Sequence, residues 1–123
     1  MEKAGLVAVL DDDERVLSSL QSFLESVGYR VAVFSSAEAF LKSQCAATCS
    51  CVVSDVAMNG MSGLALRRLL RREQPDLEVI LMTAHRDSLA LSEIDTCDRL
   101  RFFEKPFDTQ RLLSAIETLA RRL

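Results

Sequence analysis

The sequence contains no tryptophan, two prolines, four glycines and a single histidine among its 123 residues. This scarcity of glycine and proline excludes collagen-like and low-complexity chains, because both classes are rich in these residues. No apolar run approaches the roughly 20 residues that cross a bilayer, and the N-terminal sequence MEKAG lacks the pattern of a secretory signal. We therefore expect a cytoplasmic protein that does not bind membranes.

An excess of charge is also missing, since 15 basic and 18 acidic residues leave a formal net charge of −3. A balance this mild gives no general reason to expect binding to nucleic acid. Hydrophobic residues make up 49% of the chain, which is enough for one compact core at this length. The composition therefore predicts a single domain over residues 1–123.

Paired C-x2-C knuckles, the usual ligands of structural zinc, are absent. Cys45, Cys49 and Cys51 are instead spaced C-x3-C-x-C, and Cys97 lies far away in the sequence. We interpret all of them as free thiols, with Cys51 packed as a small hydrophobic residue at the start of a strand.

Short apolar runs alternate with stretches of helical periodicity along the whole chain. The runs predict strands at Leu6–Leu10, Arg30–Phe34, Cys51–Ser54, Glu78–Met82 and Arg101–Phe103. Helices are expected at residues 16–27, Ala37–Lys42, residues 64–74, Ser88–Ile94 and Leu112–Leu123. Five strands alternating with five helices indicate an α/β fold in which right-handed crossovers cover both faces of a parallel sheet.

Four helix ends carry recognisable capping signals. Asp13 is expected to cap the first helix and Gly28 to follow its last turn, while Asp108 is expected to cap the final helix. Ser35 followed by Glu38 has the spacing of a capping box at the start of the short helix.

Polar side chains follow four of the predicted strands. Asp11, Asp12 and Asp13 come after the first strand and Asp55 after the third. Thr83 follows the fourth strand and Lys105 the fifth. Parallel α/β sheets bind ligands beyond the carboxyl ends of their strands, so these groups are expected to converge there. Carboxylates in such a cluster repel one another unless a cation is present, and Mg²⁺ prefers oxygen ligands.

Each of these residues also has an ordinary structural interpretation, since single motif matches are often accidental. Acidic residues after a strand often only cap the next helix, and an isolated Thr or Lys is usually structural or solvated. Complementary groups at four strand ends of one sheet favour the functional interpretation.

The motifs Leu10-Asp11-Asp12-Asp13, Val53-Ser54-Asp55, Met82-Thr83-Ala84 and Glu104-Lys105-Pro106-Phe107 resemble, in this order, the receiver domain of bacterial two-component response regulators. The resemblance covers essentially the whole chain. The segment from Ser36 to Leu41 (SAEAFL) is similar to receivers of the nitrogen-fixation regulator type. The resemblance implies a flavodoxin-like (βα)5 three-layer sandwich with strand order 2-1-3-4-5. The sequence departs from the family pattern at Asn59, where a proline is common, and at Arg99-Leu100, where Gly-Ala is usual.

The resemblance also implies a chemistry for the clustered residues. Asp55 would accept a phosphoryl group from a sensor histidine kinase, and Lys105 and Thr83 would bind its oxygens. Mg²⁺ would be held by Asp11, Asp12, Asp55 and the backbone carbonyl of Ala57. Such a receiver is a signalling module and not an enzyme acting on an external substrate.

A switch and an output are implied as well. Thr83 would move toward the phosphoryl group, and Phe102 would enter the space that it leaves, unless Phe102 is only a packing residue. Ala57 and His85 would tune the lifetime of the phosphoryl group. The surface formed by the fourth helix, fifth strand and fifth helix would then promote a homodimer. We expect this chain to be part of a longer protein. DNA would be bound only by a helix-turn-helix domain outside this chain.

Two other interpretations remain open. A phosphatase of the haloacid dehalogenase type would use Asp11 as nucleophile and Asp13 as acid and base. Alternatively, the chain is a receiver-fold binding module that is not phosphorylated.

Overall fold

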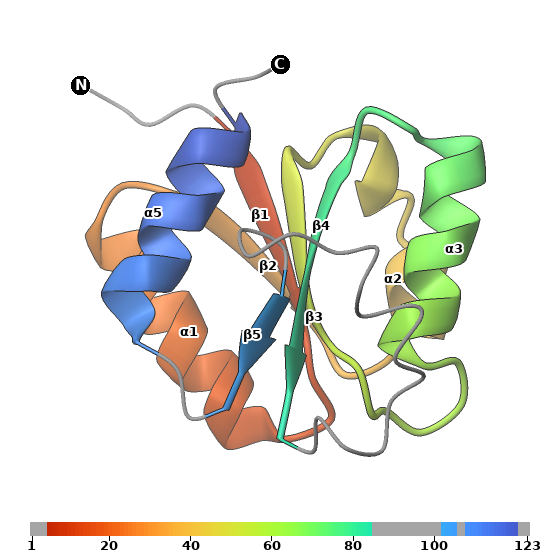
Figure 1. The fold of residues 1–123 in the computed structure, drawn as a ribbon, viewed down its shortest axis with the longest axis horizontal. Helices are drawn as coiled ribbons and strands as arrows, with labels where there is room; N and C mark the ends of the chain where they lie inside the picture. The colour runs from red at the N-terminus through yellow and green to blue at the C-terminus, as the bar shows by residue number, and fades with distance from the viewer. Residues whose placement is uncertain (1–4, 85–101, 106–107, 121–123) are drawn as a thin grey trace.

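A five-stranded parallel sheet forms the centre of the computed structural model, which describes residues 5–84, 102–105 and 108–120. The strands are β1 (Leu6–Leu10), β2 (Arg30–Phe34), β3 (Cys51–Asp55), β4 (Glu78–Thr83) and β5 (Phe102–Glu104). Their order in the sheet is β2-β1-β3-β4-β5, which confirms the flavodoxin-like arrangement (Figure 1).

Helices cover both faces of this sheet, as the sequence predicts. They are α1 (Glu14–Ser26), α2 (Ala37–Lys42), α3 (Gly63–Glu73) and α5 (Thr109–Ala120), with a short 3-10 helix η1 at Cys45–Ala47. Figure 1 shows α1 and α5 on one face and α2 and α3 on the other. The helix predicted at Ser88–Ile94 lies outside the described residues.

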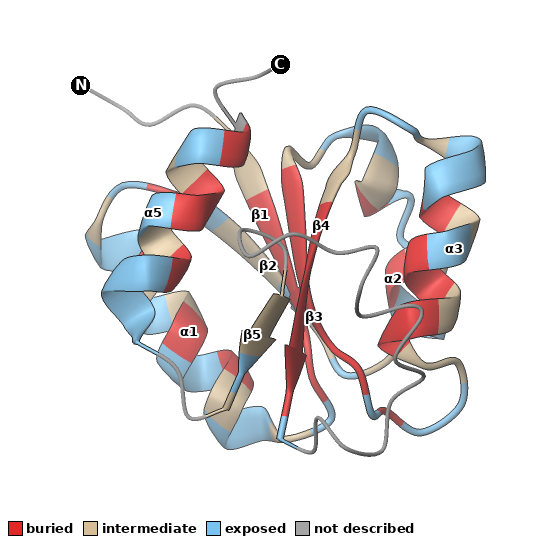
Figure 2. Ribbon diagram, viewed as in Figure 1, coloured by how far each residue is buried: buried red, intermediate tan, exposed pale blue. Residues whose placement is uncertain are grey.

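The two faces of the sheet bury separate groups of side chains. The α1–α5 core contains Val9, Val53 and Ile80 from the strands, and the α2–α3 core contains Ala8, Val52 and Leu81. Successive strand residues point to opposite faces, so the central strands must be apolar at nearly every position. Figure 2 shows the central strands as largely buried. No helix among the described residues is both long and apolar enough to cross a membrane.

Most predicted helix ends are confirmed. The Asp13 side chain accepts a hydrogen bond from the Arg15 N–H at 2.9 Å, and Asp108 accepts one from Gln110 N–H at 2.8 Å. Gly28 follows α1 with a φ of 101°, a left-handed conformation that favours glycine. Cys51 is buried in the α1–α5 core, and Cys45, Cys49 and Cys51 form no disulfide.

The predicted capping box at α2 is wrong. Ser36, not Ser35, is the N-cap residue, and its hydroxyl oxygen accepts the Ala39 N–H at 3.1 Å. Ser35 and Ser36 are adjacent and either could cap a helix, so the sequence alone leaves the start of α2 uncertain by one residue. Glu38 consequently does not occupy the third helical position, and its carboxylate makes a contact elsewhere in the fold.

Candidate functional site

The strand register brings the predicted polar residues to one edge of the sheet. Leu10 pairs with Ser54, Asp55 with Met82 and Thr83 with Glu104, so β1, β3, β4 and β5 end close together. Carboxylate oxygens of Asp11, Asp12 and Asp55 all lie within 4.8 Å of one another. We call these three residues the acidic cluster. The predicted convergence is thus found in the structure.

A single ammonium group joins two members of the acidic cluster. Lys105 Nζ lies 2.9 Å from Asp11 Oδ2 and 3.6 Å from Asp55 Oδ1. The Lys105 N–H donates to the Thr83 carbonyl at 2.7 Å, which holds the start of the loop after β5 beside the end of β4. Because the loop is held there, the long Lys105 side chain can extend past the end of β4 to the acidic cluster, which lies beyond the ends of β1 and β3.

Local hydrogen bonds fix the carboxylate that faces Lys105. The Asp11 N–H donates to the Phe34 carbonyl at 3.2 Å, which extends the pairing of β1 with β2 by one residue. Asp11 Oδ1 accepts the Asp13 N–H at 2.9 Å. Asp11 is thereby occupied on both oxygens, while the neighbouring Asp12 is exposed.

Burial and like charge act together on Asp55, whose exposed fraction is 8%. Desolvation is the largest cause that raises its pKa, and the negative charge of Asp11 raises it further, while Lys105 opposes both. Partial burial alone would lower the pKa of Lys105, but its hydrogen bond to Asp11 and the charge of Asp55 raise it overall. The acidic cluster is therefore short of positive charge.

This shortage predicts how stability depends on pH. Because the folded protein binds a proton on Asp55 more tightly than the unfolded chain, stability is lost as pH rises from the ordinary pKa of 3.8 through the raised folded value. Metal-free Asp55→Asn should therefore unfold at higher urea concentration than the unsubstituted protein at about pH 7, and this advantage should vanish near pH 3, where Asp55 is protonated in both states.

Urea unfolding in the presence of a chelator measures this difference, and the exposed Asp76→Asn serves as the control. An Asp55→Asn variant less stable than the original protein at neutral pH would contradict the expectation.

The acidic cluster has the chemistry of a site for a hard divalent cation. Mg²⁺ takes oxygen ligands and is commonly bound by one or two carboxylates together with waters and phosphate oxygens. The cluster supplies three carboxylates from two strand ends, of which Asp11 and Asp55 are buried and Asp12 is exposed. These residues fit a magnesium ion better than zinc, for which sulfur and nitrogen ligands are usual in structural sites.

The remaining predicted site residues differ in burial and packing. Thr83 is buried at the end of β4, and Ala57 is exposed in the loop after β3. Phe102 packs against the α2–α3 core, whereas its neighbour Phe103 packs against the α1–α5 core. His85 lies outside the described residues, so its expected role stays a prediction.

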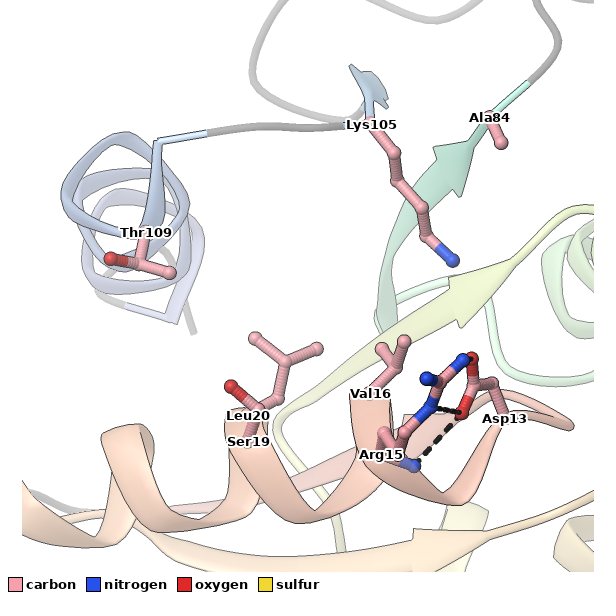
Figure 3. A pocket seen from close by; sticks show the side chains of 8 residues that line it. All are labelled: Asp13, Arg15, Val16, Ser19, Leu20, Ala84, Lys105 and Thr109. Atoms are coloured by element: carbon pink, nitrogen blue, oxygen red, sulfur yellow. Dashed lines mark hydrogen bonds and ion pairs between the residues drawn. The ribbon is translucent and has the colours of Figure 1, made fainter.

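An open groove between α1 and α5 was not predicted from the sequence. It has a volume of about 660 Å³ and is lined by Asp13, Arg15, Val16, Ser19, Leu20, Ala84, Lys105 and Thr109 (Figure 3). The Arg15 guanidinium pairs with Asp13 at 3.2 Å along its rim. Val16 and Leu20 belong to the apolar stripe of α1, and the helical period alone does not reveal that this end of the stripe borders a groove.

Comparison with known proteins agrees with this geometry. The chain belongs to the response regulator receiver domain family, whose model matches residues 7–117. It is 35% identical over 122 residues to the transcriptional regulatory protein FixJ of Bradyrhizobium diazoefficiens, covering 99% of this chain and 60% of that protein. This relative supports the resemblance to nitrogen-fixation regulators.

Solved structures give the same result. The crystal structure of FixJ-N has a TM-score of 0.83 at 32% identity and covers 98% of this chain and 97% of that one. The solution structure of a beryllofluoride-activated NtrC4 receiver domain dimer has a TM-score of 0.82 at 28% identity, with coverages of 95% and 97%. This chain is therefore a signalling module of the receiver type.

Proposed function

We propose that Asp55 accepts a phosphoryl group from the phosphohistidine of a sensor histidine kinase. The observation that carries this proposal is the approach of Lys105 Nζ to both Asp11 and Asp55, with Asp12 completing the acidic cluster. A nucleophilic carboxylate, a cation for phosphoryl oxygens and ligands for a metal ion are thereby placed within a few ångströms of one another. Phosphoryl transfer requires little more than such positioning and charge neutralisation.

In the transfer step an Asp55 carboxylate oxygen attacks phosphorus, and the bond from phosphorus to the histidine nitrogen breaks. The electron pair of that bond remains on the imidazole, which takes up a proton, and Asp55 becomes an acyl phosphate. Lys105 then exchanges its contact with the Asp55 carboxylate for a phosphoryl oxygen. The buried Thr83 hydroxyl donates to another phosphoryl oxygen at the adjacent strand end.

Asp11, Asp12, Asp55 and the Ala57 carbonyl would hold Mg²⁺ in this reaction. When bound, the ion would supply positive charge that stabilises the phosphoryl oxygens. The same residues lose mutual repulsion when the ion binds, which favours occupancy of the site. Asp11 would contribute mainly through a water molecule, because Lys105 and the Asp13 N–H already occupy its carboxylate oxygens.

The phosphoryl group would act as a switch through Thr83 and Phe102. When Thr83 turns toward the phosphoryl group, the Phe102 ring enters the vacated space, and the surface around β5 and α5 changes its partners. A homodimer is the expected result, and the activated NtrC4 receiver is described as a dimer. Ala57 and His85 would influence how quickly water removes the phosphoryl group.

The output of the longer protein is transcriptional control. The FixJ relative is named a transcriptional regulatory protein, and this chain spans 60% of its length. A helix-turn-helix domain outside this chain would bind DNA. The whole regulator would act in the cytoplasm, where its kinase presents the phosphohistidine.

Mass spectrometry after incubation with Mg²⁺ and acetyl phosphate tests the proposal. We expect one phosphoryl adduct that is labile, as acyl phosphates are, and that does not form when Mg²⁺ is removed with a chelator before the phosphodonor is added. A protein that gives no adduct would be a receiver-fold binding module. Continuous release of phosphate from many phosphoesters without a stable adduct would instead favour the phosphatase interpretation.

A further inference from the structure

A carboxylate from α2 reaches across to the loop that follows the proposed phosphorylation site. The Met61 N–H donates to Glu38 Oε2 at 2.8 Å, although the two residues are 23 positions apart. This hydrogen bond, followed by one from Glu38's own backbone N–H, lowers the pKa of Glu38. The carboxylate therefore remains ionised at neutral pH and makes a charge-assisted hydrogen bond.

Gly60 gives a second sign that the loop is fitted to this carboxylate. Its φ of 80° lies in the left-handed region, and a Cβ at this position would lie 2.6 Å from Glu38 Oε2 and 3.1 Å from Oε1. Glycine therefore allows both the turn of the backbone and its close approach to Glu38.

The loop in question joins Asp55 to α3. Its base is closed by the Val56 N–H, which donates to the Met82 carbonyl at 2.8 Å, and by the Gly63 N–H, which donates to the Val56 carbonyl at 2.9 Å. Between these points Ala57, Asn59 and Gly60 are exposed, and no proline restricts the segment. Glu38 thus holds the outer part of the loop, which the two backbone hydrogen bonds at its base do not reach.

We infer that Glu38 is a positioning residue for cation binding, holding the loop between Asp55 and α3 so that the Ala57 carbonyl faces the acidic cluster. This inference rests on the proposed magnesium-dependent phosphorylation, because Ala57 is a proposed ligand. Glu38 contacts neither cation nor phosphoryl group and acts only through the backbone at Gly60 and Met61.

Two substitutions of Glu38 separate its reach from its charge. Glu38→Asp keeps the negative charge but shortens the side chain by one methylene, so the hydrogen bond to Met61 is lost. Glu38→Gln removes the charge but retains an amide oxygen that can accept from the same N–H. A positioning role predicts weaker Mg²⁺ binding in Glu38→Asp and Glu38→Ala and nearly unchanged binding in Glu38→Gln.

The measurement is Mg²⁺ titration by calorimetry or amide NMR shifts without any phosphodonor, together with hydrogen exchange of the Met61 N–H. We expect the Kd for Mg²⁺ to rise roughly tenfold in Glu38→Ala and Glu38→Asp, the lower end of the cost of losing an outer-shell partner. Met61 should lose protection in the same two variants. Glu73→Ala, which removes an exposed glutamate at the far end of α3, should leave both quantities unchanged.

The outcomes also separate this inference from the proposed function. An unchanged Kd in Glu38→Ala, or a rise in Glu38→Gln equal to that in Glu38→Ala, would overturn the positioning role. Absence of Mg²⁺ binding by the unsubstituted protein would overturn it too. If Mg²⁺ binds with the expected pattern but acetyl phosphate gives no adduct, the inference stands and the phosphorylation proposal fails.

Discussion

Asp55→Asn is expected to abolish the phosphoryl adduct formed with acetyl phosphate and Mg²⁺. The amide oxygen of asparagine is a poor nucleophile. Among the described residues, Asp11 is the other buried carboxylate that pairs with Lys105 Nζ, at 2.9 Å compared with 3.6 Å for Asp55, and Asp11→Asn tests it separately. Mass spectrometry of the intact protein under conditions that preserve acyl phosphates measures the loss. The variant should remain folded, because asparagine has nearly the shape of the protonated side chain.

Asp11→Asn is the matched control, and it also decides between the two phosphoryl-transfer interpretations. Both oxygens of Asp11 are occupied, one by the Asp13 N–H and the other by Lys105, and its exposed fraction is 1%. Such a carboxylate is badly placed to attack an incoming donor. We expect Asp11→Asn to retain the adduct at higher Mg²⁺ concentration, whereas loss of labelling in this variant and its retention in Asp55→Asn would identify the phosphatase chemistry.

The sheet could be predicted from the sequence because its strands carry a signal that does not depend on distant contacts. A short and mainly apolar run such as Leu6–Leu10 or Cys51–Ser54 is typical of a strand covered on both faces, and a strand is found at each of them. Strand ends were less predictable, since β3 and β4 each extend one residue beyond their apolar run to include Asp55 and Thr83. Asp55 pairs there with Met82 and Thr83 pairs with Glu104. Hydrophobic periodicity does not reveal this backbone pairing.

The acidic cluster was predictable for a different reason. Parallel topology alone places the carboxyl ends of neighbouring strands together, so residues after different strands had to meet. The contact between Glu38 and Met61 was not predictable in this way. It depends on which of two serines caps α2 and on the path of the loop after Asp55, and both are set by tertiary packing.

Gly63→Ala is expected to destabilise the protein and to distort the site at the same time. Gly63 begins α3, and a Cβ there would collide with the Asp55 carbonyl oxygen and lie 3.0 Å from the Val56 Cα atom. Both contacts are with backbone, so relief requires a shift of α3 away from β3. Overpacking of this kind costs about 1–3 kcal/mol, and we expect the upper part of that range in urea unfolding.

The displaced atoms belong to the proposed phosphoacceptor and its neighbour, so the rate of adduct formation should fall by more than about tenfold, as expected for an ångström-scale misplacement. Gly28→Ala separates this effect from a general loss of stability. Gly28 lies after α1 with a φ of 101°, where alanine is strained by about 1–2 kcal/mol. That variant should be less stable but form the adduct at the normal rate. Equal rates in both glycine variants would show that close packing of α3 on Asp55 has no influence on the chemistry.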